Sequence, residues 1–202
     1  MMCDGSASPS CESRSTISRM VANDPPHPPQ FGEFEAWAGA GRVVRATKAE
    51  LATWRLPEPQ KAALISSGVP MFDELVHGVS FRAAPTMYRL AYFDDQDVHY
   101  RVTWDYGAVP ETGEVREWPP SRPGRFVNST VNHWLCSLQL VGSWFAHSRV
   151  INRWDEDAEA EDQALAEIDD LLDRIKAVDP AAIGDGSHET QFWPAVLGRW
   201  LY

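Results

Sequence analysis

The chain has 202 residues and a formal net charge of −11 at pH 7, and 44% of its residues are hydrophobic. This length favours one domain with a tail, and the negative charge argues against direct binding to nucleic acid or to an anionic membrane surface, because both require a basic protein surface. No apolar run is long enough to cross a bilayer, and the start of the chain lacks the apolar stretch of a secretory signal. We therefore expect a cytoplasmic protein.

The first part of the chain predicts a tail followed by a short helix. Residues 1–30 are rich in Ser, Pro and Asp and hold few large apolar side chains, so we expect them to be disordered. A single domain is expected to occupy residues 31–202. Within it, apolar residues at helical spacing predict a helix over residues 31–38, and a brief strand is expected at residues 41–46.

Two further helices are predicted before the first clear strand. Thr47 is followed three residues later by Glu50, which is the spacing of a capping box and predicts a helix over residues 47–54. The next helix is expected over residues 57–68, because proline is tolerated in a first turn. Gly68 can adopt the left-handed backbone that ends a helix.

The middle of the chain changes to the period of a strand. Residues 98–106 alternate strictly between polar side chains and one apolar face, which consists of Val98, Tyr100, Val102, Trp104 and Tyr106. Neighbouring strands are predicted at residues 86–93 and 113–118. The connections at residues 94–97 and 107–113 are short and prone to turns, so we expect an antiparallel meander.

The stretch RFVNSTVNHWLCSL, residues 125–138, changes from a strand pattern to a helix pattern. The strand is expected to end at Val127, and an apolar face at helical spacing follows, formed by Val131, Trp134, Leu135, Leu138, Val141 and Phe145. Asn128 or Ser129 is predicted as the N-cap, because a short side-chain oxygen accepts a hydrogen bond from a first-turn N–H. The Asn-Ser-Thr triplet also matches a glycosylation acceptor, but it is chemically silent in the cytoplasm.

The last part of the chain is predicted to be helical. A long helix is expected over residues 155–177, with an inward stripe formed by Leu165, Ile168, Leu171, Leu172 and Ile175. A final helix is expected from Phe192, because Phe192, Val196 and Trp200 recur every four residues. The order of elements predicts an α+β fold, with a central antiparallel or mixed sheet flanked by N-terminal and C-terminal helices.

Residues able to bind metal or to catalyse a reaction are scattered along the chain. The cysteines Cys3, Cys11 and Cys136 imply no disulfide framework, and no Cys or His spacing resembles a zinc site, so we expect no metal and no cofactor. His133 and Cys136 are three residues apart on a predicted helix and could meet as base and nucleophile. No third group is evident to orient His133, so we predict no catalytic site and a protein that is not an enzyme.

One segment is unusually acidic. From Asp155 to Asp173 there are ten carboxylates and no basic residue. Like charges four residues apart destabilise a helix slightly, so either this is a solvated helix face or the segment steers a basic protein partner. For the second interpretation, the candidate partner-binding residues are Asp155, Glu156, Asp157, Glu159, Glu161 and Asp162.

Four short motifs occur in a characteristic order. They are Leu56-Pro57, Gly68-Val69-Pro70, Val127-Asn128-Ser129, and Asp179-Pro180 followed by Trp193. With their spacing, the chain over roughly residues 31–200 resembles the SUKH superfamily, and more narrowly its fourth immunity subgroup in bacteria. Thr130 departs from the pattern, because the family more often has a second serine there.

The resemblance implies a protein that binds and inactivates a cognate toxin, often a nuclease or a nucleotide-modifying enzyme. Many nucleases are basic, which agrees with an acidic inhibitor. The matched motif residues are of structural type, so the resemblance transfers no catalytic residue. Two alternatives remain: a scaffold or regulatory module similar to the fungal regulators of wall synthesis in the same superfamily, and an enzyme, for which convergent polar residues are lacking.

Overall fold

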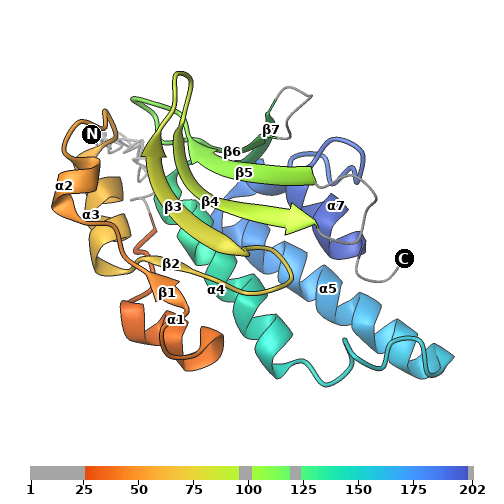
Figure 1. Cartoon of the computed structure of the whole chain (residues 1–202). Coiled ribbons are helices and arrows are strands. Elements are labelled where there is room, and N and C mark those ends of the chain that lie inside the picture. The colour runs from red at the N-terminus through yellow and green to blue at the C-terminus, as the bar shows by residue number, and fades with distance from the viewer. Residues whose placement is uncertain (1–25, 96–101, 119–123, 200–202) are drawn as a thin grey trace, which may run out of the picture.

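The computed structural model describes residues 26–95, 102–118 and 124–199. Its elements follow in the order α1 (Phe31–Ala38), β1 (Val43–Val44), α2 (Lys48–Leu51), α3 (Glu58–Ser66), β2 (Val69–Pro70), β3 (Gly78–Ala83), β4 (Tyr88–Asp95), β5 (Val102–Ala108), β6 (Val115–Trp118), β7 (Arg125–Asn128), α4 (Val131–His147), α5 (Ala158–Val178), α6 (Pro180–Ile183) and α7 (Phe192–Gly198). Figure 1 shows α1 to α3 beside one end of a central sheet, with α4 and α5 crossing behind it. The α+β fold class is confirmed.

The central sheet has five strands in the order β3-β4-β5-β6-β7, and every neighbouring pair is antiparallel. The predicted meander is therefore confirmed, and the described strands form an antiparallel sheet rather than a mixed one. Strand β3 was not predicted, although its apolar residues Val79, Phe81 and Ala83 alternate with Ser80 and Arg82. The short strands β1 and β2 pair separately, also antiparallel.

Strand β4 begins and ends two residues later than the strand predicted over residues 86–93. The prediction of a turn at residues 94–97 is wrong for its first two residues, since Asp94 pairs with Thr103 and Asp95 pairs with Val102. Pairing of the backbone N–H and C=O groups outweighs the preference of Asp for turns. The rest of that turn and the start of the predicted strand over residues 98–106 lie outside the described residues.

The N-terminal helices form where capping chemistry predicts them. Thr47 N donates to Glu50 Oε2 at 2.7 Å, and Glu50 N donates to Thr47 Oγ1 at 3.2 Å, so the predicted capping box is confirmed. The segment just before α1 runs along α4, where Asn132 Nδ2 donates to the Pro26 carbonyl at 3.5 Å. Disorder of residues 1–25 stays a prediction, because these residues lie outside the described part of the chain. Residues 26–30, the last five of the predicted tail, approach the domain.

Aromatic side chains join the sheet to the helices behind it. Tyr106 on β5 is only 1% exposed, and its ring lies 6.0 Å from the Trp134 ring on α4 and 5.8 Å from the Phe192 ring on α7. The large apolar side chains of the sheet and the helices form a single core. This core fixes α4 and α5 against one face of the sheet.

The long C-terminal helix begins later than predicted, at Ala158. Its buried residues recur every three or four positions and are Ala160, Ala164, Ile168, Leu171 and Ile175. Leu165 and Leu172 of the predicted stripe are only half-buried, because they lie at the edge of the buried face. Helix α7 confirms the predicted last helix, although Trp200 lies outside the described residues.

Candidate functional site

The strand-to-helix corner lies within the expected stretch, but its cap differs from the prediction. Strand β7 ends at Asn128 and α4 begins at Val131, with Thr130 as the N-cap. Thr130 Oγ1 accepts a hydrogen bond from His133 N at 3.3 Å. The prediction that Asn128 or Ser129 caps the helix is wrong, because both side chains are engaged elsewhere.

Asn128 and Ser129 bind a buried carboxylate. Asp179 is 2% exposed and follows directly after α5. Its Oδ2 accepts from Asn128 Nδ2 at 3.0 Å and from Ser129 N at 2.7 Å, while its Oδ1 accepts from Ser129 Oγ at 2.8 Å. Trp193 Nε1 donates to Asn128 Oδ1 at 3.2 Å, which adds α7. This cluster, the Asp179 network, ties β7, the end of α5 and α7 together.

Gln60 supports the same corner, and no pattern in the sequence pointed to it. Its side chain is 5% exposed although it lies on the short helix α3. Val131 N, at the start of α4, donates to Gln60 Oε1 at 3.2 Å, and Gln60 Nε2 donates to the Thr112 carbonyl at 2.9 Å. Gln60 thus satisfies a first-turn amide of α4 from a distant part of the chain.

His133 and Cys136 do not form a catalytic pair. The His133 ring nitrogen Nδ1 lies 2.7 Å from Thr130 Oγ1, and Cys136 Sγ donates to the His27 carbonyl at 3.4 Å. Burial raises the pKa of the Cys136 thiol to about 11, so at neutral pH it is protonated and a poor nucleophile. Burial also lowers the pKa of His133, and the negative charge of Asp179 opposes that shift.

The first three acidic candidates lie before or at the start of α5 and have different roles. Asp155 is exposed, and Glu156 forms an ion pair with Arg153 at 2.7 Å. Asp157 is the N-cap of α5, since its Oδ1 accepts from Ala160 N at 2.9 Å. A carboxylate at this position stabilises the helix, so Asp157 has a structural role.

The other three acidic candidates do not share one face. Glu159 and Asp162 are exposed, and they lie about 60° apart around an ideal helix. Glu161 is half-buried and lies about 200° from Glu159, on nearly the opposite side. Within the described residues, Asp155, Glu159 and Asp162 form no ion pair. We call these three residues the free acidic surface.

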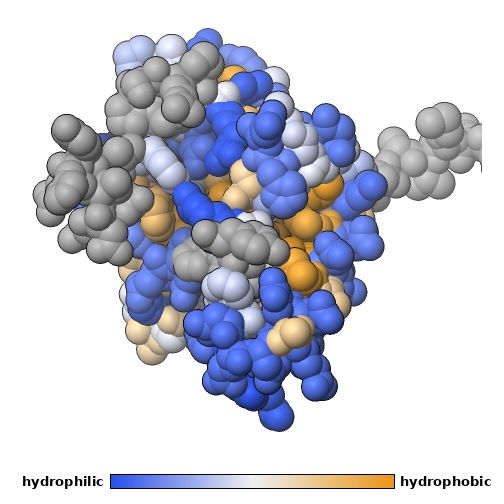
Figure 2. Space-filling model, turned by 90° about the vertical axis from the view of Figure 1, so that its right-hand side faces the viewer, coloured by the Kyte–Doolittle hydropathy of each residue, from blue (hydrophilic) through white to orange (hydrophobic). Residues whose placement is uncertain are grey.

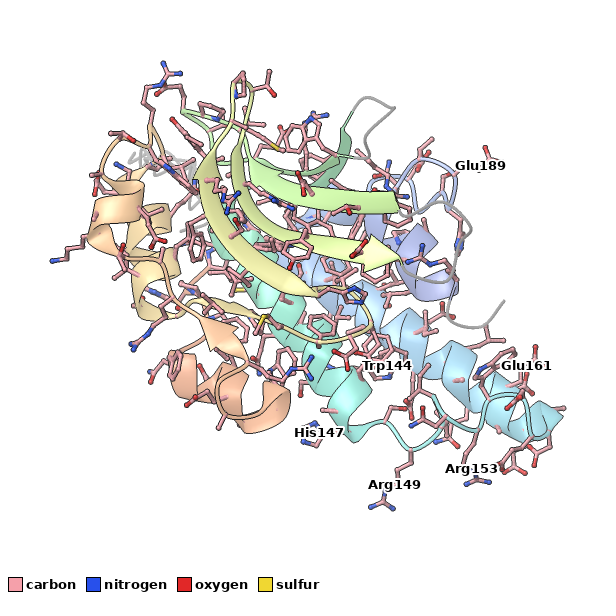
Figure 3. The ribbon with its side chains drawn as sticks, viewed as in Figure 1. Trp144, His147, Arg149, Arg153, Glu161 and Glu189 are labelled. Atoms are coloured by element: carbon pink, nitrogen blue, oxygen red, sulfur yellow. The ribbon has the colours of Figure 1, made fainter. Side chains whose placement is uncertain are left out.

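Basic side chains also lie near the start of α5, which the prediction did not anticipate. Figure 3 shows His147, Arg149 and Arg153 along the lower edge of the molecule, with Glu161 above them at the start of α5. His147 is the last residue of α4, and Arg149 is exposed in the connection to α5. Figure 2 shows that hydrophilic residues cover this end of the molecule. The surface therefore carries both signs of charge.

The described residues hold neither a metal-binding cluster nor a membrane-spanning helix. Among residues 26–95, 102–118 and 124–199, no three His, Cys, Asp or Glu side chains are placed to hold a metal ion together. In the same part of the chain, no helix is long and apolar enough to cross a membrane.

Comparison with known families decides where the chain belongs. The family model of the SUKH-4 immunity protein matches residues 29–199, which is nearly the whole described domain. The chain belongs to the SUKH-4 immunity protein family. No curated protein and no solved structure matches it significantly.

The motifs that carried the SUKH-4 resemblance have structural roles. Leu56 is 5% exposed, and Pro57 is the N-cap of α3. Gly68 has φ of +78°, and a Cβ there would lie 2.8 Å from the Val44 carbonyl oxygen, so only glycine fits without strain. The remaining two motifs meet in the Asp179 network. These SUKH-4 motif residues therefore stabilise the domain.

Proposed function

We propose that this SUKH-4 immunity protein binds and neutralises one cognate toxin protein in the cytoplasm by direct contact. The family match is the observation that carries this proposal. The toxin class is a nuclease or a nucleotide-modifying enzyme with a basic surface. Inhibition follows from occupation of the surface that the toxin uses for its phosphate-bearing substrate, and it needs no catalytic step by the immunity protein.

The free acidic surface supports the choice of a basic partner. Asp155, Glu159 and Asp162 are exposed and carry charge that no ion pair within the described residues offsets. A surface that binds nucleic acid phosphates must be positively charged. An uncompensated negative surface on the inhibitor speeds diffusional encounter with such a toxin, and salt weakens this effect.

Affinity must come mainly from other contacts. Rim charges change the association rate more than the dissociation rate, whereas buried aromatic and arginine contacts supply most of the binding energy. The acidic residues are therefore assigned to encounter and orientation. The positive charges of Arg149 and Arg153, near the start of α5, would help to set the orientation of the toxin.

The test is co-expression of the tagged chain with the product of each adjacent gene. We expect one such product to be toxic alone, to be tolerated together with the chain, and to be captured with it. Capture of a housekeeping protein without any rescue of growth would favour a scaffold instead. If no adjacent product is both neutralised and captured, the proposal fails.

A further inference from the structure

A groove of about 520 Å³ opens between the second half of α4 and the middle of α5. Trp144 lies in it between the two helices (Figure 3). The other lining residues are Leu140, Ser143, His147 and Ser148 on the α4 side, and Gln163, Ala166, Glu167, Asp170, Leu171 and Arg174 on α5. The groove is amphipathic, with apolar side chains from both helices and carboxylates from α5.

The Trp144 ring is held in a fixed orientation. Its Nε1 donates to Glu167 Oε2 at 3.0 Å, and Ser148 Oγ donates to the same oxygen at 2.6 Å. Glu167 is half-buried and lies one turn before Asp170. Both hydrogen bonds use Oε2, so within the described residues the second oxygen of Glu167 remains able to accept from a ligand.

The second carboxylate of the groove is only loosely engaged. Asp170 lies 3.8 Å from Arg174, and the two side chains are 72% and 55% exposed. An exposed ion pair four residues apart on a helix contributes little and is readily exchanged. Asp170 is thus available to a better-placed cation, and it lies on the same side of α5 as Glu167.

We propose that this groove binds an arginine side chain of the toxin. The inference rests on the proposed function, because it names one contact of that same interface. The aliphatic stem of an arginine packs against Leu140 and Trp144, and its planar guanidinium donates to Glu167 and Asp170. Arginine fits better than lysine, because its fork can donate to two carboxylates while it stacks on an indole ring.

A partner-independent measurement tests the groove directly. The full chain, labelled with ¹⁵N, is titrated with N-acetyl-arginine amide while the indole N–H signal of Trp144 is followed, after its assignment by comparison with Trp144→Phe. We expect a saturable shift of that signal, and a smaller one with N-acetyl-lysine amide at the same concentration. The shift should vanish in the double variant Glu167→Gln, Asp170→Asn.

A matched control distinguishes the groove from general charge. The double variant Asp169→Asn, Asp173→Asn removes the same charge from exposed positions of α5 that do not line the groove, and it should keep the shift. The inference is overturned if the Trp144 signal does not respond to the arginine amide, or responds equally in the Glu167 and Asp170 variant. A signal that moves when the chain is concentrated alone indicates a second copy in the groove and also overturns it.

The toxin provides the second measurement. With a captured toxin, the Glu167→Gln, Asp170→Asn variant should bind about tenfold more weakly, and the Asp169 and Asp173 control should stay within about twofold of the parent. Equal binding by both variants would refute the inference while the proposed function stands. Conversely, failure to capture any toxin defeats the proposed function. The titration with N-acetyl-arginine amide then tests by itself whether the groove binds an arginine side chain.

Discussion

Asp179 and Asp162 are the same residue type in opposite surroundings. Asp179 is 2% exposed and accepts hydrogen bonds from Asn128 and Ser129, whereas Asp162 is exposed on α5 and forms no ion pair within the described residues. The first carboxylate holds segments of the chain together, and the second leaves its charge available to solvent and to a partner. A buried carboxylate such as Asp179 maintains the fold, whereas exposed ones such as Asp162 are available to the proposed partner.

The physical reason for the difference is desolvation. Burying a carboxylate costs several kcal/mol unless good hydrogen bonds offset that penalty, and the Asp179 network supplies them. An exposed carboxylate pays no such penalty, so its removal changes stability little. Mutation of Asp179 should therefore lower stability, whereas mutation of the exposed carboxylates should slow association with the partner.

The largest effect is expected for Asp179→Ala. The substitution removes the acceptor of three hydrogen bonds from the buried Asn128 and the half-buried Ser129, so we expect the free energy of unfolding to fall by about 3–5 kcal/mol. Denaturant unfolding followed by tryptophan fluorescence measures it, with Asp162→Ala as the control that should stay within about 0.5 kcal/mol of the parent. Equal losses of unfolding free energy in the two variants would contradict the different roles of the buried and the exposed carboxylate.

Asn128→Ala is expected to have the next largest effect. Its side chain is fully buried and is hydrogen-bonded to Asp179, Ser137 and Trp193. We expect a loss of about 2–3 kcal/mol in unfolding free energy, because these partners lose their bonds and a small cavity remains. A double-mutant cycle with Asp179→Ala should give a clearly non-additive result, whereas additivity would show that the residues act independently.

Charge reversal tests the role of the exposed carboxylates in association. We expect Asp155→Lys, Glu159→Lys and Asp162→Lys together to slow association with the toxin about tenfold at low salt, and much less at high salt. Glu156 and Asp157 are left unchanged, because one pairs with Arg153 and the other caps α5. Stopped-flow association rates measure the effect.

The control for charge reversal carries the same change of charge on other elements. It is Glu35→Lys on α1 with Glu74→Lys and Glu189→Lys in connecting segments, and it should slow association less than reversal of the free acidic surface does. If both variants slow association equally, total charge steers the encounter, and the free acidic surface is a solvated helix face.

The smallest effect is expected for Thr130→Ala. Loss of the hydrogen bond from His133 N to Thr130 Oγ1 should lower the free energy of unfolding by about 1 kcal/mol, the usual effect of a lost N-cap. Thermal unfolding measures it, and Thr130→Ser should retain most of the stability. A loss as large as that of Asn128→Ala would mean that Thr130 contributes more than a cap.

Local patterns were sufficient for much of the fold. The helix over residues 31–38, the Thr47–Glu50 capping box and the antiparallel meander follow from interactions between residues close in sequence, so periodicity and capping signals predicted them. The end of β4 at Asp94 and Asp95 lacks such signals, since pairing with β5 defines it. Strand β3 was missed although Val79, Phe81 and Ala83 alternate with Ser80 and Arg82. The motifs of the resemblance likewise identified the family correctly.

The sequence by itself determined which segments are acidic, where the strand-to-helix corner lies and which family the chain belongs to, because these depend on composition and order. Only the tertiary structure decided what the polar residues at the corner and along α5 do. Asn128 looked like a cap and is instead bound to Asp179, 51 residues away. Trp144 and Glu167 meet only because α4 and α5 pack side by side. Burial and long-range contact set the role of a charge, and neither can be read from neighbours along the chain.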